Sequence, residues 1–342
     1  MMTDKFIFLT TPMRSGSSYL SRILSAHPTI AMSYDTVNFF RFCFHRYDPI
    51  SEPSNLRRLL EDMAFRLLHR FDIKLDVAQC LSIIPPDERS YARAYWSILR
   101  TIFPDRGKVI FGDKESMAWT KVPHFLDMFP NGRAIVIVRD PRDVVTSFKR
   151  TTIAPGNDYL IALFNIVDAV NHAVRYQLRD PQRVYMVQFE RLKLNVEEET
   201  KKLCAFLGID FVPGMLDLEQ YTDHSGRKWN SEDHMTFPDE KDPLAPVGRW
   251  RTKIDPEDLY LCEWIARTQL PLLGLSPSGR SFSQAEFDRA WQAVTSSPLL
   301  REALKRWCDS GEGVERCPLD PTDPANWDRG WVKDPEAFSN KV

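Results

Sequence analysis

The stretch Lys5–Pro28 reads KFIFLTTPMRSGSSYLSRILSAHP, and it decides the fold of the chain. Residues 6–9 form a short, apolar, aromatic-rich run that is typical of a strand buried in a parallel sheet. Proline, serine and glycine in residues 12–16 then interrupt this pattern. Apolar residues in 19–24 follow at helical spacing, and Pro28 marks the end of that helix. The stretch therefore predicts a strand, a tight polar loop and a helix.

The loop of this unit has the properties of an anion-binding site. A strand that leads into a Gly/Ser loop directs backbone N–H groups and the positive end of the helix dipole at one point. Arg14 adds a positive charge. An ATP-type P-loop needs Gly-x4-Gly-Lys-Ser/Thr, but Thr11 and Ser17 stand where the first glycine and the lysine belong. The alternative is an ordinary turn between strand and helix that carries a surface arginine.

The composition predicts a globular protein. The 342 residues are 43% hydrophobic and 27% charged, and the net charge of −2 implies no broad basic face for nucleic acid. Six scattered cysteines suggest free thiols in a reducing compartment. There is no secretory signal pattern, and the apolar runs are shorter than a membrane span. We therefore expect a cytoplasmic protein with neither nucleic acid nor membrane as a partner; its oligomeric state is not readable.

A second anion site is predicted after the strongest strand of the chain, residues 134–138. Arg139 ends this strand, Asp140 is a good N-cap, and Pro141 suits the first position of a helix. Ser147 lies about two turns further along that helix. Arg139 and Ser147 can therefore hold one anion together. The alternative is that Arg139 forms a surface ion pair and Ser147 merely fills the helix.

Strands that alternate with helices predict an α/β fold with a mostly parallel central sheet flanked by helices. Further strands are expected at 29–32, 109–111 and 184–189, and helices at 54–71, 88–103, 119–129, 158–179, 197–207, 256–273 and 283–307. Ligands of such folds bind at the carboxyl ends of the strands, where the loop at 12–18, Asp113 with Lys114, and Arg139 all fall. We expect one domain over 1–308, with a helical acceptor-side block at about 38–105, and a tail at 309–342 packed on it.

These motifs resemble the sulfotransferase family that uses 3′-phosphoadenylyl sulfate (PAPS). TTPMRSGSSYL resembles the family's 5′-phosphosulfate loop, and VIVRDPRDVVTSF resembles its 3′-phosphate element. VQFERLKLNVEEETKKLCAFLGI resembles a strand–Glu-x-Leu–helix segment, and VGRWR resembles a late Gly-x-Trp element. The chain is more similar to bacterial-type and Golgi-type members than to the cytosolic enzymes. The resemblance implies a P-loop-like sulfotransferase fold.

The resemblance also implies roles for individual residues. PAPS, or its product adenosine 3′,5′-bisphosphate (PAP), is expected to contact Arg14, Ser15, Gly16, Ser17, Ser18, Arg139, Ser147, Gly248 and Arg249. Lys114 matches a basic residue that flanks the transferring group, and no metal is expected. The cytosolic enzymes have a catalytic histidine where this chain has Ser116, and they have Arg-Lys-Gly where it has the segment 243–245.

A general base for the acceptor hydroxyl is therefore sought elsewhere. Many non-cytosolic members have a carboxylate just after the second strand, and the resemblance favours Asp35 for this role, with Glu115 and His45 as alternatives. Phenylalanines in 39–44 form core or line an apolar pocket, which favours a small alcohol or phenol as the acceptor. N-sulfation of a small molecule, a P-loop-type nucleotide kinase and a non-enzymatic nucleotide-binding protein are the other hypotheses.

Overall fold

The computed structural model describes residues 5–103, 107, 109–151, 155–217, 244–311 and 323 of the chain. Its five strands are β1 (Lys5–Thr11), β2 (Ile30–Tyr34), β3 (Ile110–Ser116), β4 (Arg133–Val138) and β5 (Val184–Gln188). All neighbouring strands pair in parallel, in the order β2-β3-β1-β4-β5. The predicted α/β fold with a parallel central sheet is thus confirmed.

The strands are connected by helices that cover the sheet. The helices are α1 (Ser17–Ser25), α2 (Phe39–Phe42), α3 (Pro53–Phe71), α4 (Val77–Ser82), α5 (Tyr91–Ile102), α6 (Val122–Met128), α7 (Pro141–Thr151), α8 (Ile161–Arg179), α9 (Phe189–Leu194), α10 (Val196–Leu207), α11 (Trp250–Lys253), α12 (Pro256–Ile265), α13 (Gln269–Leu272), α14 (Gln284–Ser296) and α15 (Pro298–Ser310). Short 3-10 segments lie at Pro86–Glu88, Trp119–Lys121, Asp158–Leu160 and Pro213–Leu216.

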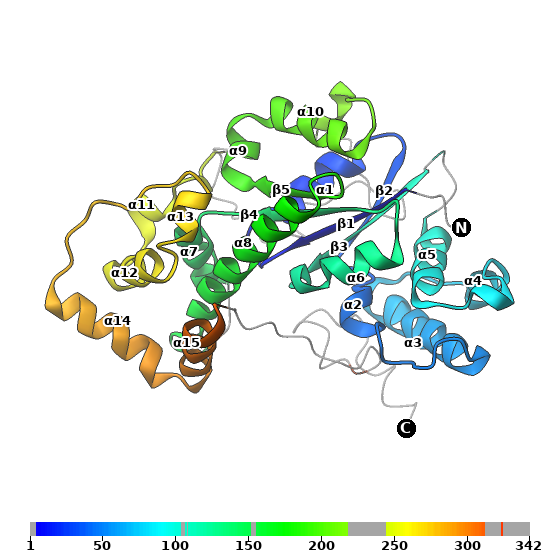
Figure 1. Cartoon of the computed structure of the whole chain (residues 1–342), viewed down its shortest axis with the longest axis horizontal. Helices are drawn as coiled ribbons and strands as arrows, with labels where there is room; N and C mark the ends of the chain where they lie inside the picture. The colour runs from blue at the N-terminus through cyan, green and yellow to red at the C-terminus, as the bar shows by residue number, and fades with distance from the viewer. Residues whose placement is uncertain are drawn as a thin grey trace.

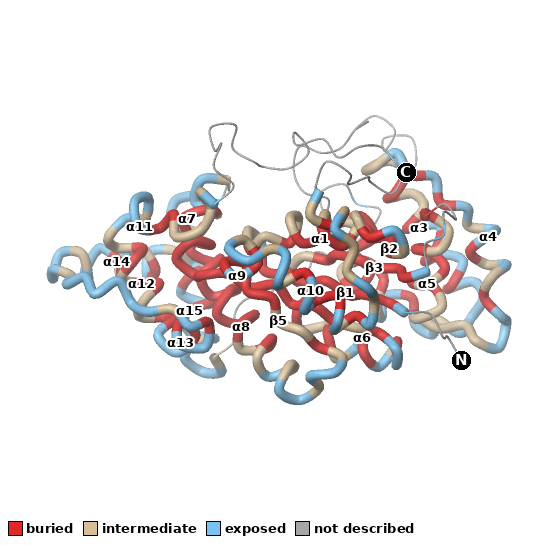
Figure 2. Tube along the Cα trace, turned by 90° about the horizontal axis from the view of Figure 1, so that it is seen from above, coloured by how far each residue is buried: buried red, intermediate tan, exposed pale blue. Residues whose placement is uncertain are grey.

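Two apolar cores cover the two faces of the sheet. Because side chains alternate along a strand, Phe6 and Phe8 of β1 pack with α2, α3, α5, α6 and α8, whereas Ile7 and Leu9 pack with α1 and α10. Figure 1 shows α9 and α10 above the sheet, and α3–α5 at the opposite end of the molecule from α12 and α14. Buried residues are concentrated along the strands and α8 (Figure 2).

Several predicted boundaries differ from the observed ones. The helix expected at 283–307 is two helices, because Ser297 caps α15 and Pro298 stands at its first position. The helix expected at 256–273 is interrupted after Ile265. The strand expected at 109–111 continues to Ser116, because it pairs with β1 as far as Ser116 and with β2 as far as Lys114. The segment 113–116 is therefore part of the sheet and not a loop.

Other expectations concern parts of the chain that are described only in part. Apart from residues 309–311 and 323, the expected tail at 309–342 lies outside the described residues. In the described part, the five cysteines Cys43, Cys80, Cys204, Cys262 and Cys308 are free thiols, as expected. None of the helices found there has the length and apolar character needed to cross a bilayer.

The register of the sheet brings the ends of three strands together. Thr11 at the end of β1 is the register partner of Ser116 on β3, and its hydroxyl donates to Ile137 O of β4 at 3.1 Å. The loop after β1, the end of β3 and the residue after β4, Arg139, are therefore neighbours at one edge.

Candidate functional site

The loop between β1 and α1 is shaped to receive an anion. Arg14 and Gly16 adopt positive φ angles of 67° and 90°, and Gly16 precedes α1 without a side-chain cap. The hydroxyl of Ser15 is buried and has no hydrogen-bond partner. A buried polar group without a partner is unfavourable, so this hydroxyl and the start of α1 fit a bound anionic group.

The predicted second anion site lies directly beside this loop. Arg139 donates to Arg14 O at 3.0 Å and to Pro246 O, and its guanidinium lies 4.8 Å from the ring centroid of Phe189. Arg14 Nε donates to Ser147 Oγ at 3.1 Å. Because a hydroxyl that accepts a hydrogen bond keeps its own donor, Ser147 can still donate to an anion. The structure therefore brings Arg14, Arg139 and Ser147 into one contiguous site.

The site contains an aromatic residue that sequence reasoning did not single out. Phe189 begins α9 directly after β5, and a Cβ atom added to Gly16 would overlap its ring carbons. Phe189 therefore packs against both the Gly16 loop and the guanidinium of Arg139. Its only sequence signal is its place at the carboxyl end of a predicted strand, which gives no indication of these two contacts.

Two buried carboxylates, Asp143 and Glu190, lie near Arg139. The sequence did not indicate the contacts that either of them makes. Asp143 accepts hydrogen bonds from Gly248 N at 2.7 Å and from Trp250 N at 2.8 Å, and it lies 3.9 Å from the guanidinium. Glu190 accepts from Asp140 N at 2.9 Å, and burial raises its pKa to about 7. Burial disfavours the charged form of Arg139 as well and lowers its pKa, and the nearby carboxylates of Asp143 and Glu190 partly offset this effect.

Asp143 therefore attaches the late Gly-x-Trp segment to the start of α7. This attachment places Gly248 and Arg249 near the Arg139 site, and Arg249 lies close enough to interact electrostatically with Arg139. Ser17 and Ser18 begin α1, and the Ser18 hydroxyl is hydrogen-bonded to the Tyr34 hydroxyl. All nine residues expected to contact the nucleotide are thus found at the loop, at Arg139 or on adjacent segments.

A second polar cluster lies at the ends of β2 and β3. Lys114 Nζ forms an ion pair with Asp35 and donates to Ser116 Oγ at 2.8 Å. Asp35 also accepts from Ser116 N at 3.1 Å, and its own N–H donates to Lys114 O at 2.9 Å. Burial lowers the pKa of Lys114, but Asp35 and Tyr34 outweigh this effect and the net pKa is raised. Asp35, Lys114 and Ser116 therefore form one hydrogen-bonded unit.

The three candidate bases have different surroundings. The Asp35 side chain is 33% exposed and thus partly open to solvent. Glu115 is 0% exposed and accepts from Phe40 N at 3.1 Å and Arg41 N at 2.7 Å, which places its carboxylate at the start of α2. The His45 side chain is 63% exposed and hydrogen-bonded to Asp48 at 2.9 Å. Of the three candidate bases, only Asp35 accepts a hydrogen bond from Lys114 Nζ.

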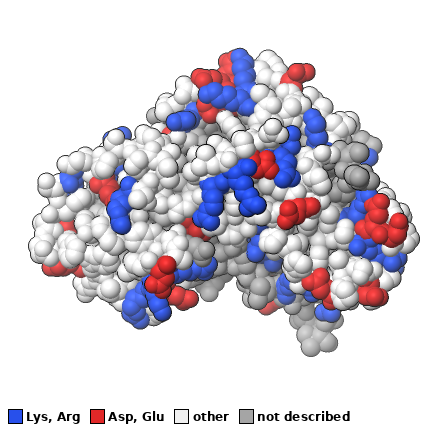
Figure 3. Space-filling view, in the orientation of Figure 1, with Lys and Arg blue, Asp and Glu red and all other residues white. Residues whose placement is uncertain are grey.

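The surface charge is mixed on the face shown in Figure 3, where basic and acidic side chains are interspersed. Two positive charges of the candidate site are instead buried, with the Arg139 side chain 5% exposed and that of Lys114 3% exposed, whereas Arg14 is partly buried. Buried charges in a low-dielectric environment interact more strongly with a bound anion than surface charges do. The structure is therefore an α/β protein whose candidate site lies at the carboxyl ends of the strands of a parallel sheet.

The chain belongs to the sulfotransferase family of enzymes, because the model of that family matches residues 7–213. No curated protein matches the chain. Among solved structures, a sulfotransferase domain from the curacin biosynthetic pathway is 19% identical with a TM-score of 0.53, over 81% of this chain and 99% of that chain. A sulfotransferase domain from the Synechococcus PCC 7002 olefin synthase is 20% identical with a TM-score of 0.48, over 77% and 94%.

A mouse sulfotransferase, SULT7A1, solved in complex with PAP is 14% identical with a TM-score of 0.39, over 86% of this chain and 89% of that chain. At these identities the likeness of the curacin domain shows the shared fold, and the family match carries the assignment to the sulfotransferases. The resemblance noted in the sequence is thereby confirmed at the level of family and fold.

The contact between Gly16 and Phe189 leads to a testable prediction. We expect Gly16→Ala to weaken PAP binding at least about tenfold and to destabilise the fold by about 1–3 kcal/mol, because the new methyl group would overlap the Phe189 ring at an unfavourable backbone angle. Isothermal titration and thermal melting measure the two effects. Gly279→Ala is the matched control: its φ is 73°, but no atom lies within 4 Å of the added Cβ. Equal PAP affinity in the two variants would contradict the prediction.

Proposed function

We propose that this protein transfers the sulfuryl group of PAPS to a hydroxyl group of a small, natural-product-like acceptor. One observation carries the proposal: Arg14 contacts both Arg139 and Ser147, although 125 and 133 residues separate it from them in sequence. A βα loop and a second arginine–serine pair thus meet at the N-terminus of α1. Such a site suits an adenosine donor that has anionic groups at both its 5′ and 3′ positions.

The residues present fit the expected nucleotide. Ser15 has a buried hydroxyl without a partner, and the uncapped start of α1 adds backbone donors, so both would hold the 5′-phosphosulfate with Arg14. Arg139 and Ser147 would hold the 3′-phosphate, and Gly248 and Arg249 would close over it from the segment that Asp143 attaches. When bound, PAPS would supply the sulfuryl group and a phosphate leaving group. No metal ion is needed in this proposal.

Asp35 would act on the proton of the acceptor, and Lys114 would act on the negative charge of the transferring group. As the acceptor oxygen bonds to sulfur, Asp35 would accept the proton of the acceptor hydroxyl. Lys114, which Asp35 and Ser116 hold in place, would stabilise negative charge on the transferring group. Arg14 would stabilise the charge that develops on the departing phosphate oxygen as its bond to sulfur breaks. Sulfuryl transfer thus has the same needs for positioning and charge as phosphoryl transfer.

N-sulfation is a second candidate activity, and a nucleotide kinase is a third that one residue of the loop argues against. N-sulfation requires only an amine in place of the acceptor hydroxyl. A nucleotide kinase requires a P-loop lysine, and Ser17 occupies that position here. We further propose a cytoplasmic location, since the described cysteines are free thiols and such thiols persist in a reducing compartment.

The purified protein provides the test. We expect isothermal titration to show binding of PAP and none of ATP, and we expect sulfate transfer from labelled PAPS to a member of a panel of alcohols, phenols and amines, detected by mass spectrometry. Transfer only to amines would support N-sulfation. PAP binding without transfer to any acceptor would favour a nucleotide-binding role, and phosphoryl transfer from ATP would favour a kinase.

A further inference from the structure

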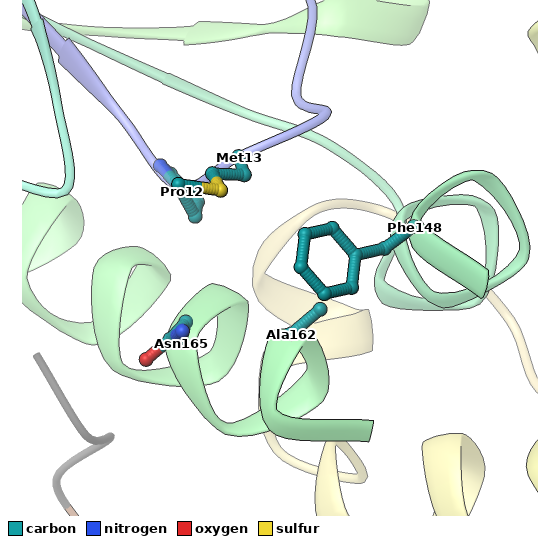
Figure 4. A pocket seen from close by; sticks show the side chains of 5 residues that line it. All are labelled: Pro12, Met13, Phe148, Ala162 and Asn165. Atoms are coloured by element: carbon teal, nitrogen blue, oxygen red, sulfur yellow. The ribbon is translucent and has the colours of Figure 1, made fainter. Parts of the chain in front are cut away.

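The loop before α1 has different neighbours on its two sides. Towards α7 and α8 it borders a cavity of about 20 Å³, lined by Pro12, Met13, Phe148, Ala162 and Asn165 (Figure 4). That volume has room for one water molecule and for no larger ligand. Towards β2, the Ser18 hydroxyl at the start of α1 is hydrogen-bonded to the hydroxyl of Tyr34. Tyr34 is therefore the polar neighbour of the loop on the β2 side.

Tyr34 also contacts the hydrogen-bonded unit of Asp35, Lys114 and Ser116. The Lys114 ammonium lies 4.4 Å from the centroid of the Tyr34 ring, a distance at which an aromatic face attracts a cation. Tyr34 is also the register partner of Lys114 in the pairing of β2 with β3, and Asp35 directly follows it in the chain. One side chain thus touches both the start of α1 and the amine that the proposed mechanism places at the transferring group.

The hydroxyl of Tyr34 can set the direction in which Ser18 donates. Burial raises the pKa of Tyr34 above its usual value, so the hydroxyl keeps its proton at neutral pH. When Tyr34 donates to Ser18 Oγ, Ser18 retains its own proton for an anionic group at the start of α1. The same hydrogen bond restricts the rotamer of Ser18. This donor is therefore oriented before the nucleotide binds.

The ring of Tyr34 restricts Lys114 in a comparable way. An ammonium group has three donors, and among the described residues Asp35 and Ser116 take two of them. The third donor remains for an oxygen of a bound group. A lysine side chain loses much rotamer freedom when it is fixed, and the aromatic face offsets part of that cost because it attracts the ammonium.

We propose that Tyr34 is a positioning residue of the sulfuryl transfer, whose hydroxyl orients Ser18 towards the donor and whose ring fixes the Lys114 ammonium. The inference rests on the proposed sulfotransferase function and adds a residue that connects donor binding with turnover. It assigns separate tasks to two parts of one side chain: the hydroxyl acts on the affinity for the nucleotide, and the ring acts on the turnover number. Variants that remove the two parts one at a time distinguish these tasks.

The hydroxyl is tested by a double-mutant cycle with Ser18. Tyr34→Phe keeps the ring, and we expect it to weaken PAP binding about threefold to tenfold, the scale of one lost hydrogen bond. In a Ser18→Ala background the same change should alter PAP affinity by less than about twofold, because the hydroxyl then has no serine to orient. Isothermal titration with PAP measures all four proteins and needs no acceptor.

The ring is tested by comparing Tyr34→Leu with Tyr34→Phe at saturating PAPS. Both variants lack the hydroxyl, so we expect equal PAP affinity, but the turnover number of Tyr34→Leu should be about tenfold lower because Lys114 loses the aromatic face. When Lys114→Met is added to both, this difference should disappear. A purely structural role of the ring would lower the melting temperature and leave turnover per folded molecule equal in the two variants.

Tyr159 provides the matched control, because its surroundings repeat those of Tyr34 in contact with α12 instead of the loop before α1. Its hydroxyl donates to Asp258 at 2.8 Å, and the Lys149 ammonium lies 4.6 Å from the centroid of its ring. We expect Tyr159→Phe and Tyr159→Leu to keep PAP affinity and turnover per folded molecule within about twofold of the wild type.

Two outcomes would overturn this inference while the wild-type protein still binds PAP and transfers sulfate. One is a further loss of PAP affinity when Tyr34→Phe is added to Ser18→Ala, and the other is equal turnover of Tyr34→Phe and Tyr34→Leu. A wild-type protein that binds no PAP would instead refute the proposed function, and the inference with it.

Discussion

Arg139→Ala is expected to weaken PAP binding more than about 100-fold, the scale of a lost charge-assisted contact. The guanidinium does more than supply charge: it holds Arg14 O at 3.0 Å and Pro246 O, and it lies over Phe189. Its removal therefore loosens the loop as well as the proposed 3′-phosphate contact. Arg139→Lys keeps the charge but cannot donate in both directions from a planar group, so we expect an intermediate loss. Isothermal titration with PAP measures both.

The control for this variant must separate lost binding from lost stability. Removing Arg139 leaves Asp143 and Glu190 buried without their neighbouring cation, which should destabilise the fold by about 3 kcal/mol. Arg183→Ala is the matched control, because Arg183 also pairs with a carboxylate, Asp180 at 2.8 Å, and donates to a backbone carbonyl, Leu126 O at 3.2 Å, at the opposite edge of the sheet. Unchanged PAP affinity in folded Arg139→Ala would refute the assigned role.

The parts of the fold that repeat a simple pattern could be predicted from the sequence. The apolar run of β4 and the change of period after β1 indicate a parallel sheet, and the parallel sheet places the polar loops at one edge. Arg14, Arg139 and Ser147 could be expected there for that reason alone. Helix α2 could not be predicted, because its four residues are too few for a periodic pattern and its start depends on the distant Glu115 carboxylate.

The roles of Asp143 and Phe189 in the site could not be predicted for the same reason as helix α2: they depend on contacts between residues that are distant in sequence. Asp143 contacts Gly248 N across 105 residues, and Phe189 packs on Gly16 across more than half the described chain. Their roles depend on which strands become neighbours and on the exact direction of one side chain, neither of which leaves a local pattern.

Asp35→Asn is expected to lower the turnover number about 10²–10⁴-fold, the usual contribution of a general base, with PAP affinity changed by less than about threefold. Asparagine can still accept from Ser116 N, now 3.1 Å from Asp35 Oδ1, so the backbone arrangement should persist. It cannot take a proton from the acceptor, and it replaces the ion pair with Lys114 by a neutral contact. The assay uses labelled PAPS and the acceptor found in the panel screen.

Three further variants decide whether Asp35 or another residue is the base. Ser116→Ala keeps the Asp35–Lys114 pair and removes one hydroxyl, so a loss below about tenfold is expected. Glu115→Gln should lower the melting temperature and leave turnover per folded molecule near wild type, because its carboxylate is fully buried against the start of α2. His45→Gln should change neither, since that imidazole is exposed. Full turnover in Asp35→Asn together with its loss in either alternative would move the proton-accepting role to that residue, and Lys114 would then act on charge alone.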